Sequence, residues 1–235
     1  MPGLYRNNDF KDNCGFGLIT NRYGIKSHSV ITKSISALKS MTHRGGIGSD
    51  GRTGDGCGLL LNLDHEFFRK KIWREQKINL PKHYAVSQMF LDQPIDKILP
   101  KLKKILKNED LQLEAVRQVP VNKKILGTIA LDCLPKIYQL FVSAAKDDVS
   151  EEEFECSLLQ ARKFFEELHN NDELLYVCSM SGRTIVYKGL MLPDVIDEFY
   201  IDLKQKDFTA SICVSTKDFL PIQALDGILL NLLGY

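Results

Sequence analysis

The sequence predicts a layered α+β domain, in which antiparallel strands form sheets and helices cover them. Short apolar or alternating segments, typical of strands, arrive mostly in neighbouring pairs, and longer segments with apolar residues at helical spacing separate the pairs. A doubly wound parallel sheet would instead alternate one strand with one helix along the chain. The 235 residues, 44% of them hydrophobic, suffice for one such domain with a substantial core.

The N-terminal elements are a strand and a helix. Residues 14–20 (CGFGLIT) form an apolar stretch typical of a short buried strand. Apolar residues recur at helical spacing across 27–41, which predicts a helix. Ser27 suits its N-cap, because a serine hydroxyl can accept a bond from a free N–H of the first turn. The pair Gly45-Gly46 is expected to end this helix.

A glycine-dense loop, residues 43–58 (HRGGIGSDGRTGDGCG), follows the helix. Its seven glycines fall within fourteen consecutive residues, which implies positive φ angles or close approach of the backbone to a ligand. The loop has neither the Gly-Lys-Ser/Thr of a phosphate loop nor G-x-G-x-x-G before a helix. A structural loop and a site-building loop both remain open. Arg44 and Asp55 could orient a polar substrate, or they could pair with the loop backbone.

The middle of the chain contains both predicted strands and predicted helices. Residues 57–63 predict a strand, and 64–76 predict a helix with Asp64 as its N-cap. The next elements are, in order, a strand at 83–91, a helix with an internal proline at 95–108, a strand at 111–119, an extended segment at 125–135 and a strand at 136–145.

The last third of the chain begins with the longest helix, expected at 150–171. Ser150 and Glu153 form the S-x-x-E pattern of a capping box at its start. Residues 173–191 predict a hairpin that turns at Ser181-Gly182. The remaining elements are a short helix at 192–200 and a strand at 208–215.

Charge and hydropathy exclude several classes of partner. The net charge of +1 leaves no clustered basic excess for nucleic acid or an anionic membrane. No apolar run approaches the roughly 20 residues of a membrane-spanning helix. The first fourteen residues lack the apolar stretch of a secretory signal, so a cytoplasmic location is expected.

The cysteines and histidines show no metal-ligand spacing. No two of the six cysteines form C-x-x-C, and the five histidines are scattered, so no metal site is predicted. In a reducing compartment most of the thiols should be buried and free. They are Cys14, Cys57, Cys133, Cys156, Cys178 and Cys213.

Cys14 is the thiol for which the sequence offers a route to reactivity. By itself, a cysteine at the start of a strand suits a core position. If residues 1–13 were removed, Cys14 would carry a free α-amine with a pKa of about 7.7–8.0, low enough to accept a proton near neutrality. Nucleophile and base would then belong to one residue. In the intact chain the same nitrogen is an amide and cannot act as a base.

Three motifs together closely resemble the start of the glutamate synthase large-subunit family. They are Cys-Gly-Phe-Gly at 14–17, Met-x-His-Arg-Gly at 41–45 and Asp-Gly-x-Thr-Gly-Asp-Gly at 50–56. The resemblance runs from about Asp9 to Val214 and marks a class II glutamine amidotransferase domain of the N-terminal nucleophile (Ntn) type. It implies an αββα sandwich of two antiparallel sheets between helical layers, incomplete at the C-terminus.

The resemblance also implies a reaction. Removal of a propeptide, residues 1–13, would leave Cys14 to attack the side-chain amide of L-glutamine, with its own α-amine as base. Ammonia would leave, and water would release glutamate from the thioester. Four residues match the motif beside the nucleophile and are expected to bind substrate or support the site: Arg44, Gly45, Asp55 and Gly56.

No cofactor or metal is expected in this segment itself. In the full family enzyme the ammonia travels to a distant FMN site and aminates 2-oxoglutarate, and that enzyme also uses an iron–sulfur cluster. The implied partners are the rest of the large subunit and a small NAD(P)H-oxidising subunit.

The sequence departs from the family pattern after Val214. The family there has His-x-Arg-Phe-Ser-Thr-Asn-Thr, whose arginine holds the substrate carboxylate, and later His-Asn-Gly-Glu, whose Asn-Gly forms the oxyanion hole. Residues 215–235 (STKDFLPIQALDGILLNLLGY) contain neither motif. Back-translated and read from the third base of each preceding codon, this tail permits the first of them. A one-base frameshift near Val214 is therefore expected; an apolar helix that closes a smaller domain is the alternative.

The expected organisation is a propeptide at 1–13, a partial amidotransferase domain at 14–214 and a frameshifted tail at 215–235. Without an oxyanion hole, the chain is expected to have little or no glutaminase activity. Two other functions stay open: a non-catalytic Ntn-fold module that binds a partner, and an amidotransferase domain that feeds ammonia to a different acceptor. Loss of thirteen residues, measured by intact mass, would favour the enzymatic interpretation.

Overall fold

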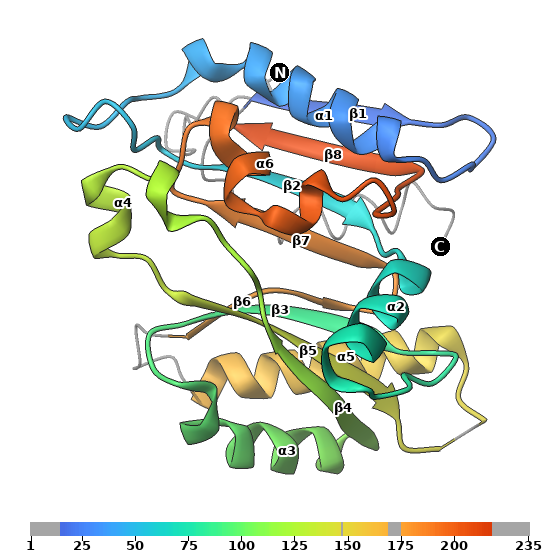
Figure 1. Cartoon of the computed structure of the whole chain (residues 1–235). Coiled ribbons are helices and arrows are strands. Elements are labelled where there is room, and N and C mark those ends of the chain that lie inside the picture. Colours follow the sequence, from blue (N-terminus) through green and yellow to red (C-terminus); the bar gives the residue numbers. More distant parts are fainter. Residues whose placement is uncertain (1–14, 147, 169–174, 218–235) are drawn as a thin grey trace, which may run out of the picture.

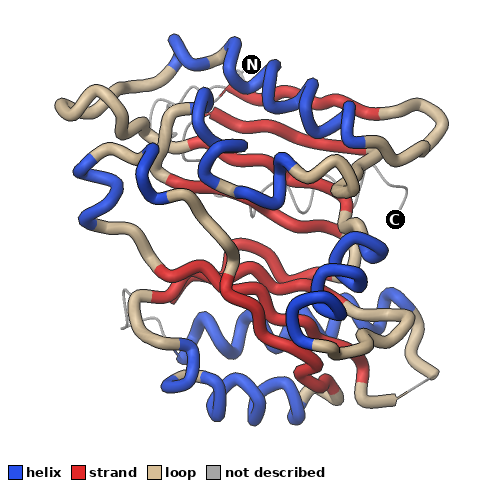
Figure 2. Tube along the Cα trace, viewed as in Figure 1, coloured by secondary structure: helices blue, strands red, loops and turns tan. Residues whose placement is uncertain are grey.

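A computed structural model describes residues 15–146, 148–168 and 175–217, apart from the side chains of Arg44 and Leu168. Eight strands in these ranges form two four-stranded antiparallel sheets, and helices lie against both (Figures 1 and 2). The mixed α+β class predicted from the pairing of strand segments is confirmed. No helix within the described ranges combines the length and apolar character needed to cross a membrane.

The first sheet has the strand order β1-β8-β2-β7, and each neighbouring pair is antiparallel. Its strands are β1 (Gly15–Thr20), β8 (Ile212–Lys217), β2 (Cys57–Asn62) and β7 (Thr184–Gly189). Helix α1 (His28–Ser40) lies along this sheet, and the short α6 (Ile196–Phe199) lies beside it in Figure 1. The buried face of α1, which includes Ile31 and Leu38, packs into the main core.

The second sheet has the order β4-β5-β3-β6 and is also antiparallel. Its strands are β4 (Leu111–Gln118), β5 (Lys136–Ala144), β3 (Ala85–Leu91) and β6 (Leu175–Ser181). Helices α3 (Leu99–Asn108) and α5 (Glu151–Leu168) cover it at the end of the molecule opposite α1 (Figure 1). Met89, Leu140, Leu106 and Phe165 belong to the core cluster between this sheet and its helices.

The main core joins the two sheets. It includes Leu59 and Leu61 of β2, Phe141 of β5 and aromatic side chains of α2 (His65–Gln76). Phe67 of α2 stacks on Phe208, with ring centroids 4.5 Å apart. The aromatic contacts bury large apolar areas, so α2 connects the sheets through packing and not through backbone pairing.

Two of the three helix starts predicted from capping residues are made as expected. The Asp64 carboxylate accepts a bond from the backbone N–H of Phe67 at 3.2 Å. At the start of α5, the Glu153 N–H donates to Ser150 Oγ at 3.2 Å and the Ser150 N–H donates to Glu153 Oε2 at 3.0 Å, which completes the capping box. Ser27 occupies the N-cap position of α1, but its side chain makes no cap bond.

The extended segment predicted at 125–135 is wrong. The chain there forms a 3₁₀ turn (Lys123–Ile125) and then a short helix, α4 (Thr128–Asp132). The backbone N–H groups of Ile129 and Ala130 donate to side chains of Asp50 and Thr53, more than 70 residues earlier. Because the free N–H groups of the first turn of α4 find their acceptors in a distant part of the chain, the local sequence contains no capping signal that predicts this helix.

The hairpin predicted at 173–191 is correct in its turn and wrong in its pairing. The chain does reverse at Ser181-Gly182, where Ser181 Oγ accepts a bond from the Arg183 N–H at 2.9 Å. However, β6 pairs with β3 in the second sheet, whereas β7 pairs with β2 in the first. The turn therefore transfers the chain from one sheet to the other.

Several boundaries also differ from the predicted ones. Helix α1 ends at Ser40, before a 3₁₀ turn at Thr42–Arg44, so Gly45-Gly46 does not end it. The predicted proline-containing helix is divided into a 3₁₀ turn at Ile95–Lys97 and α3, which has Pro100 in its first turn, where the missing N–H has no helical acceptor in any case. Shorter segments follow: 3₁₀ turns at Pro193–Val195 and Ile201–Lys204, on either side of α6.

Candidate active site

The ends of the four strands of the first sheet form one row beside the start of β1. Cys14 lies outside the described residues, but Gly15 begins β1 and pairs with Lys217 of β8. Lys217 also pairs with Cys57 at the start of β2, and Cys57 pairs with Gly189 at the end of β7. We call this row the Gly15 edge. Gly15 therefore lies in the same row as Cys57, where the glycine loop enters β2.

The glycine loop is folded back on itself by its own backbone. The Gly48 N–H donates to the Thr53 carbonyl at 2.7 Å, and Ile47 forms an isolated bridge with Gly54. A Cβ on Gly54 would lie 2.8 Å from the Met191 carbonyl, so glycine is required where the loop passes the chain after β7. Gly56 has φ of 128°, a conformation that side chains disfavour. The loop thus needs specific glycines for packing and for backbone conformation.

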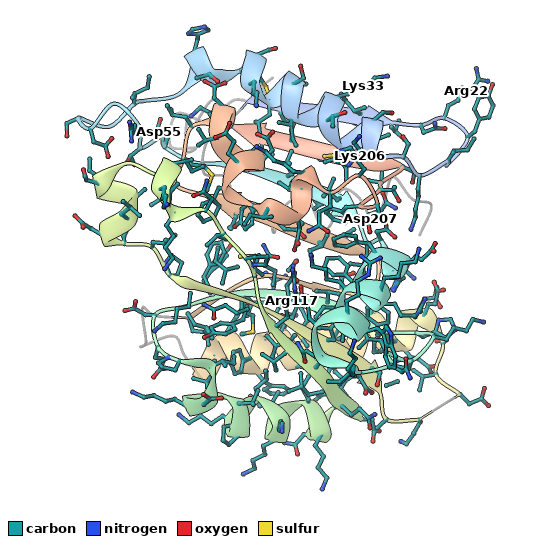
Figure 3. The ribbon with its side chains drawn as sticks, in the orientation of Figure 1. Arg22, Lys33, Asp55, Arg117, Lys206 and Asp207 are labelled. Atoms are coloured by element: carbon teal, nitrogen blue, oxygen red, sulfur yellow. The ribbon has the colours of Figure 1, made fainter. Side chains whose placement is uncertain are left out.

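Asp55, predicted to support the site, closes the base of this loop. Its carboxylate Oδ2 accepts a short hydrogen bond from the backbone N–H of Gly46. A Cβ on Gly46 would lie 2.8 Å from Asp55 Oδ1, so the contact needs glycine at position 46. Figure 3 shows Asp55 on the loop at the α1 end of the molecule. The Asp55 carboxylate thus pairs with the loop backbone.

Arg44 and Gly45 lie where the loop leaves α1. Arg44 is the last residue of the 3₁₀ turn Thr42–Arg44, and its side chain lies outside the description. Gly45 is extended, with φ of −125°, and its N–H donates to the Thr42 carbonyl at 3.5 Å. The four predicted supporting residues therefore belong to one loop, at its two ends.

Asp50 is the loop residue that sequence reasoning missed. Its Oδ1 accepts bonds from the backbone N–H groups of Arg52 and Thr53 at 3.0 and 2.8 Å. Its Oδ2 accepts from Thr53 Oγ1 at 2.6 Å and from the Ile129 N–H at 3.1 Å. Hydrogen bonds from Thr53 are the main reason that the pKa of Asp50 lies well below its usual range.

Thr53 completes the same contact. While its hydroxyl donates to Asp50, the hydroxyl oxygen accepts a bond from the Ala130 N–H at 3.2 Å. Two side chains of the glycine loop thus cap α4, although they are distant in sequence. The spacing Asp-Gly-Arg-Thr is typical of an Asx-type turn, but nothing local to it indicates a second helix. We call the bonds from Ile129 and Ala130 to this pair the loop–α4 contact.

We expect Asp50→Asn to loosen the loop–α4 contact, because an amide nitrogen cannot accept the bonds that a carboxylate oxygen accepts. Hydrogen exchange of the 47–56 and 126–132 segments should become faster. Because the pKa of Asp50 is lower in the folded chain than in the unfolded chain, where it is about 3.9, the ionised carboxylate stabilises the fold at pH values above about 3.9. This stabilisation is lost as the pH falls through the folded-state pKa of Asp50. The wild-type segments should therefore remain protected at about pH 3. Asp132→Asn, at the exposed end of α4, is the control; equal exchange in both variants would contradict the assignment.

Three other thiols near the sheets are unsuitable as nucleophiles. Burial raises the pKa of the Cys57, Cys178 and Cys213 thiols to about 12. The thiolate is the reactive species, so these groups stay protonated and unreactive near neutral pH. This matters most for Cys57, because that residue itself lies on the Gly15 edge.

A cavity of about 410 Å³ opens beside the Gly15 edge. Its wall includes Ala130 and Cys133 of the α4 region and Gly189 and Met191 after β7, the two segments that hold the glycine loop. Lys188 also lies in this wall, where its Nζ donates to the Tyr176 hydroxyl at 2.6 Å and burial lowers the pKa of the amine. The volume is in the range of small-molecule sites. Within the described ranges, no group of three or more His, Cys, Asp or Glu side chains could hold a metal ion.

Comparison with protein families gives one match over most of the chain. The family model described as "Glutamine amidotransferases class-II" matches residues 14–220. The match begins at Cys14, ends three residues after β8 and includes both described sheets.

Individual relatives are glutamate synthases. The chain is 36% identical over 218 residues to the glutamate synthase [NADPH] large chain of Bacillus subtilis, covering 90% of this chain and 14% of that protein. It is 36% identical over 211 residues to ferredoxin-dependent glutamate synthase 1 of Arabidopsis thaliana, covering 86% and 13%. The yeast glutamate synthase [NADH] is 33% identical over 225 residues, with 90% and 10% covered. The chain thus spans about one seventh or less of the length of these relatives.

Proposed function

Because the chain belongs to the class II glutamine amidotransferases, we propose that it is the glutamine-hydrolysing part of a glutamate synthase, with Cys14 as nucleophile. The observation that carries the proposal is the position of β1. Its first described residue, Gly15, is in one row with Cys57, where the folded glycine loop enters β2, and this supports a nucleophile directly before β1. Cys57 itself is excluded by the raised pKa of its thiol.

The reaction proceeds by acyl transfer. With residues 1–13 removed, the α-amine of Cys14 takes the thiol proton, and Sγ attacks the side-chain amide carbon of glutamine. The C–N bond breaks, the proton passes to the leaving nitrogen, and ammonia departs from a thioester. Water, deprotonated by the same amine, then releases glutamate and restores the thiol. General base assistance of this kind contributes about 10²–10⁴ in rate.

The wider role belongs to the proposal as well. The relatives are glutamate synthases, so the ammonia would aminate 2-oxoglutarate at an FMN site in the rest of the large subunit. An iron–sulfur cluster and a small NAD(P)H-oxidising subunit would complete that enzyme, in the cytoplasm. An amidotransferase that supplies a different acceptor is the competing assignment.

We further propose the division into a propeptide at 1–13, an amidotransferase part at 14–214 and a frameshifted tail at 215–235. The side chain of Lys217 supports the boundary. It is fully buried in β8, and lysine is among the residue types least often fully buried. Ladder hydrogen bonds use backbone atoms, so β8 can continue to Lys217 whatever side chains follow Val214.

Two measurements on the 235-residue polypeptide test the proposal. Intact mass should show loss of residues 1–13. Ammonia release from glutamine should be no faster than that of the Cys14→Ala variant. The 235 residues contain no Asn-Gly pair that could form the oxyanion hole. Loss of a single oxyanion-hole donor already lowers the rate about 10²–10³-fold. Retention of residues 1–13 would favour a binding module. Steady turnover of glutamine would contradict the expected inactivity.

Sequencing the coding DNA tests the frameshift separately. A single-base shift near codon 214 should restore a reading frame with His-x-Arg-Phe-Ser-Thr-Asn-Thr. The protein translated in that frame should release ammonia from glutamine, and its Cys14→Ala variant should not. A coding frame without this motif would overturn the proposed tail.

A further inference from the structure

Helix α3 presents the most strongly basic surface of the second sheet's helical layer. Five exposed lysines lie between positions 97 and 107, and no aspartate or glutamate occurs from 97 to 108. Within the described ranges none of the five is in an ion pair, whereas Lys39, Lys70, Lys71 and Lys146 are. The five are Lys97, Lys101, Lys103, Lys104 and Lys107. Like-charged side chains at helical spacing repel one another, so a carboxylate ligand bound beside these lysines would reduce their mutual repulsion.

A groove of about 580 Å³ runs beside this surface, between α3 and α5. On the α3 side the groove is lined by Lys101, Lys104 and Ile105. On the α5 side the groove is lined by Phe164, a large apolar side chain that is 48% exposed. An aromatic ring left this accessible beside a buried isoleucine provides an apolar floor.

The lining of the groove also carries negative charge. Glu109, just after α3, and Glu167, near the end of α5, line the groove together with Asn108. The lining therefore holds two ammonium groups from α3 and two carboxylates, one at the end of each helix. A nucleic acid or an anionic lipid surface would place its phosphates against these two carboxylates, so the groove disfavours both.

The part of the groove lined by α3 is long enough to contact another α-helix. Lys101, Lys104, Ile105 and Asn108 are related by three- and four-residue steps along α3, so they form a stripe about 10 Å long at 1.5 Å per residue. A helix laid in the groove could place an apolar ridge between the two helices already present. Helix-in-groove recognition of this kind uses apolar anchors at i, i+3, i+4 and i+7.

We propose that the α3–α5 groove is a docking site for an amphipathic helix of a protein partner. The apolar side chains of that helix contact Ile105 and Phe164, and its acidic flank faces Lys101 and Lys104. The site is independent of glutamine hydrolysis, because α3 and α5 lie at the end of the molecule opposite α1 (Figure 1). Attraction between the two surfaces would accelerate association and weaken with added salt.

A labelled peptide of about 18 residues tests the proposal, with Leu at every third or fourth position, as in helix-in-groove ligands, and Glu elsewhere. Fluorescence anisotropy should show binding to the purified 235-residue chain that weakens between about 50 and 300 mM salt. Lys101→Glu/Lys104→Glu should reduce affinity about tenfold or more, since like charges would then face each other. Phe164→Ser should also reduce it. Phe164 is half exposed, so this variant should fold, as circular dichroism would verify.

Two controls separate specific docking from general attraction. Lys33→Glu/Lys206→Glu makes the same charge change at two exposed lysines near α1, which Figure 3 places away from α3. This variant should bind as the wild type does. A peptide of the same composition, scrambled so that its leucines share no face, should bind at least about tenfold more weakly. Absence of peptide binding, equal weakening by both lysine pairs, or tighter binding of a DNA duplex would overturn the proposal.

Discussion

Asp202→Ala is expected to lower the free energy of unfolding by about 3–5 kcal/mol, because it leaves a buried guanidinium without its nearest counter-charge. Arg117 of β4 is 2% exposed and Asp202 is fully buried. The pair is bidentate: Arg117 Nη1 donates to Asp202 Oδ2 at 2.6 Å, and Nη2 donates to Oδ1 at 3.0 Å. Figure 3 shows Arg117 in the interior between the two sheets.

The remaining partners of Arg117 place this loss near the lower end of the range. Its Nε donates to Glu75 of α2 at 2.8 Å, and Nη1 also donates to Gln139 of β5 at 2.9 Å. Burial disfavours the charged guanidinium, but hydrogen bonds and charges of Asp202 and Glu75 outweigh it and raise the pKa of Arg117 above its usual value. Because Glu75 is partly exposed to solvent, its ion pair with Arg117 cannot replace the solvent-excluded pair of Arg117 with Asp202.

Urea unfolding measures the loss, and Asp207→Ala is the matched control. Asp207 is exposed and lies 3.8 Å from the exposed Arg74, so its removal should cost no more than about 1 kcal/mol. The double variant Arg117→Met/Asp202→Leu should recover much of the stability, since apolar replacement of both partners removes the unpaired charge. A single-variant loss no larger than that of Asp207→Ala would show that the ion pair contributes little.

This network also shows what local sequence can and cannot reveal about the fold. The capping residues Asp64, Ser150 and Glu153 act within a few residues, so the starts of α2 and α5 could be predicted. Nothing near Arg117 indicates that its partner is Asp202, which is 85 residues away. The turn at Ser181-Gly182 is local and was predicted, whereas the division of β6 and β7 between two sheets depends on β2 and β3.

The candidate site divides in the same way. Glycine density located the loop, because several of its positions require a positive φ or close packing, as Gly54 and Gly56 do. It could not distinguish the two aspartates. Asp55 closes the loop locally, whereas Asp50 makes the contact with α4, and that helix was itself predicted as an extended segment. The role of Asp50 could be identified only from its three-dimensional contact with α4.

Gly127→Ala is expected to break the loop–α4 contact from the opposite side and to lower the free energy of unfolding by about 1–3 kcal/mol. A Cβ on Gly127 would lie 2.2 Å from Asp50 Oδ2 and 2.6 Å from Thr53 Oγ1. The Gly127 backbone, with φ of −73°, suits any residue, so the cost comes from this overlap. Asp50 and Thr53 must withdraw, and the Ile129 and Ala130 N–H groups then lose their acceptors.

Gly51→Ala separates this overlap from the usual cost of replacing a loop glycine. Gly51 has φ of 68°, and a Cβ there would meet no atom within 4 Å, so alanine should cost about 1–2 kcal/mol of backbone strain with no steric overlap. Hydrogen exchange of 126–132 should therefore stay slow in Gly51→Ala and become fast in Gly127→Ala. Slow exchange in both variants would show that α4 does not depend on the loop. Fast exchange in Gly127→Ala alone would show that the position of the glycine loop, and so of the backbone leading into the Gly15 edge, is set by a helix more than 70 residues away.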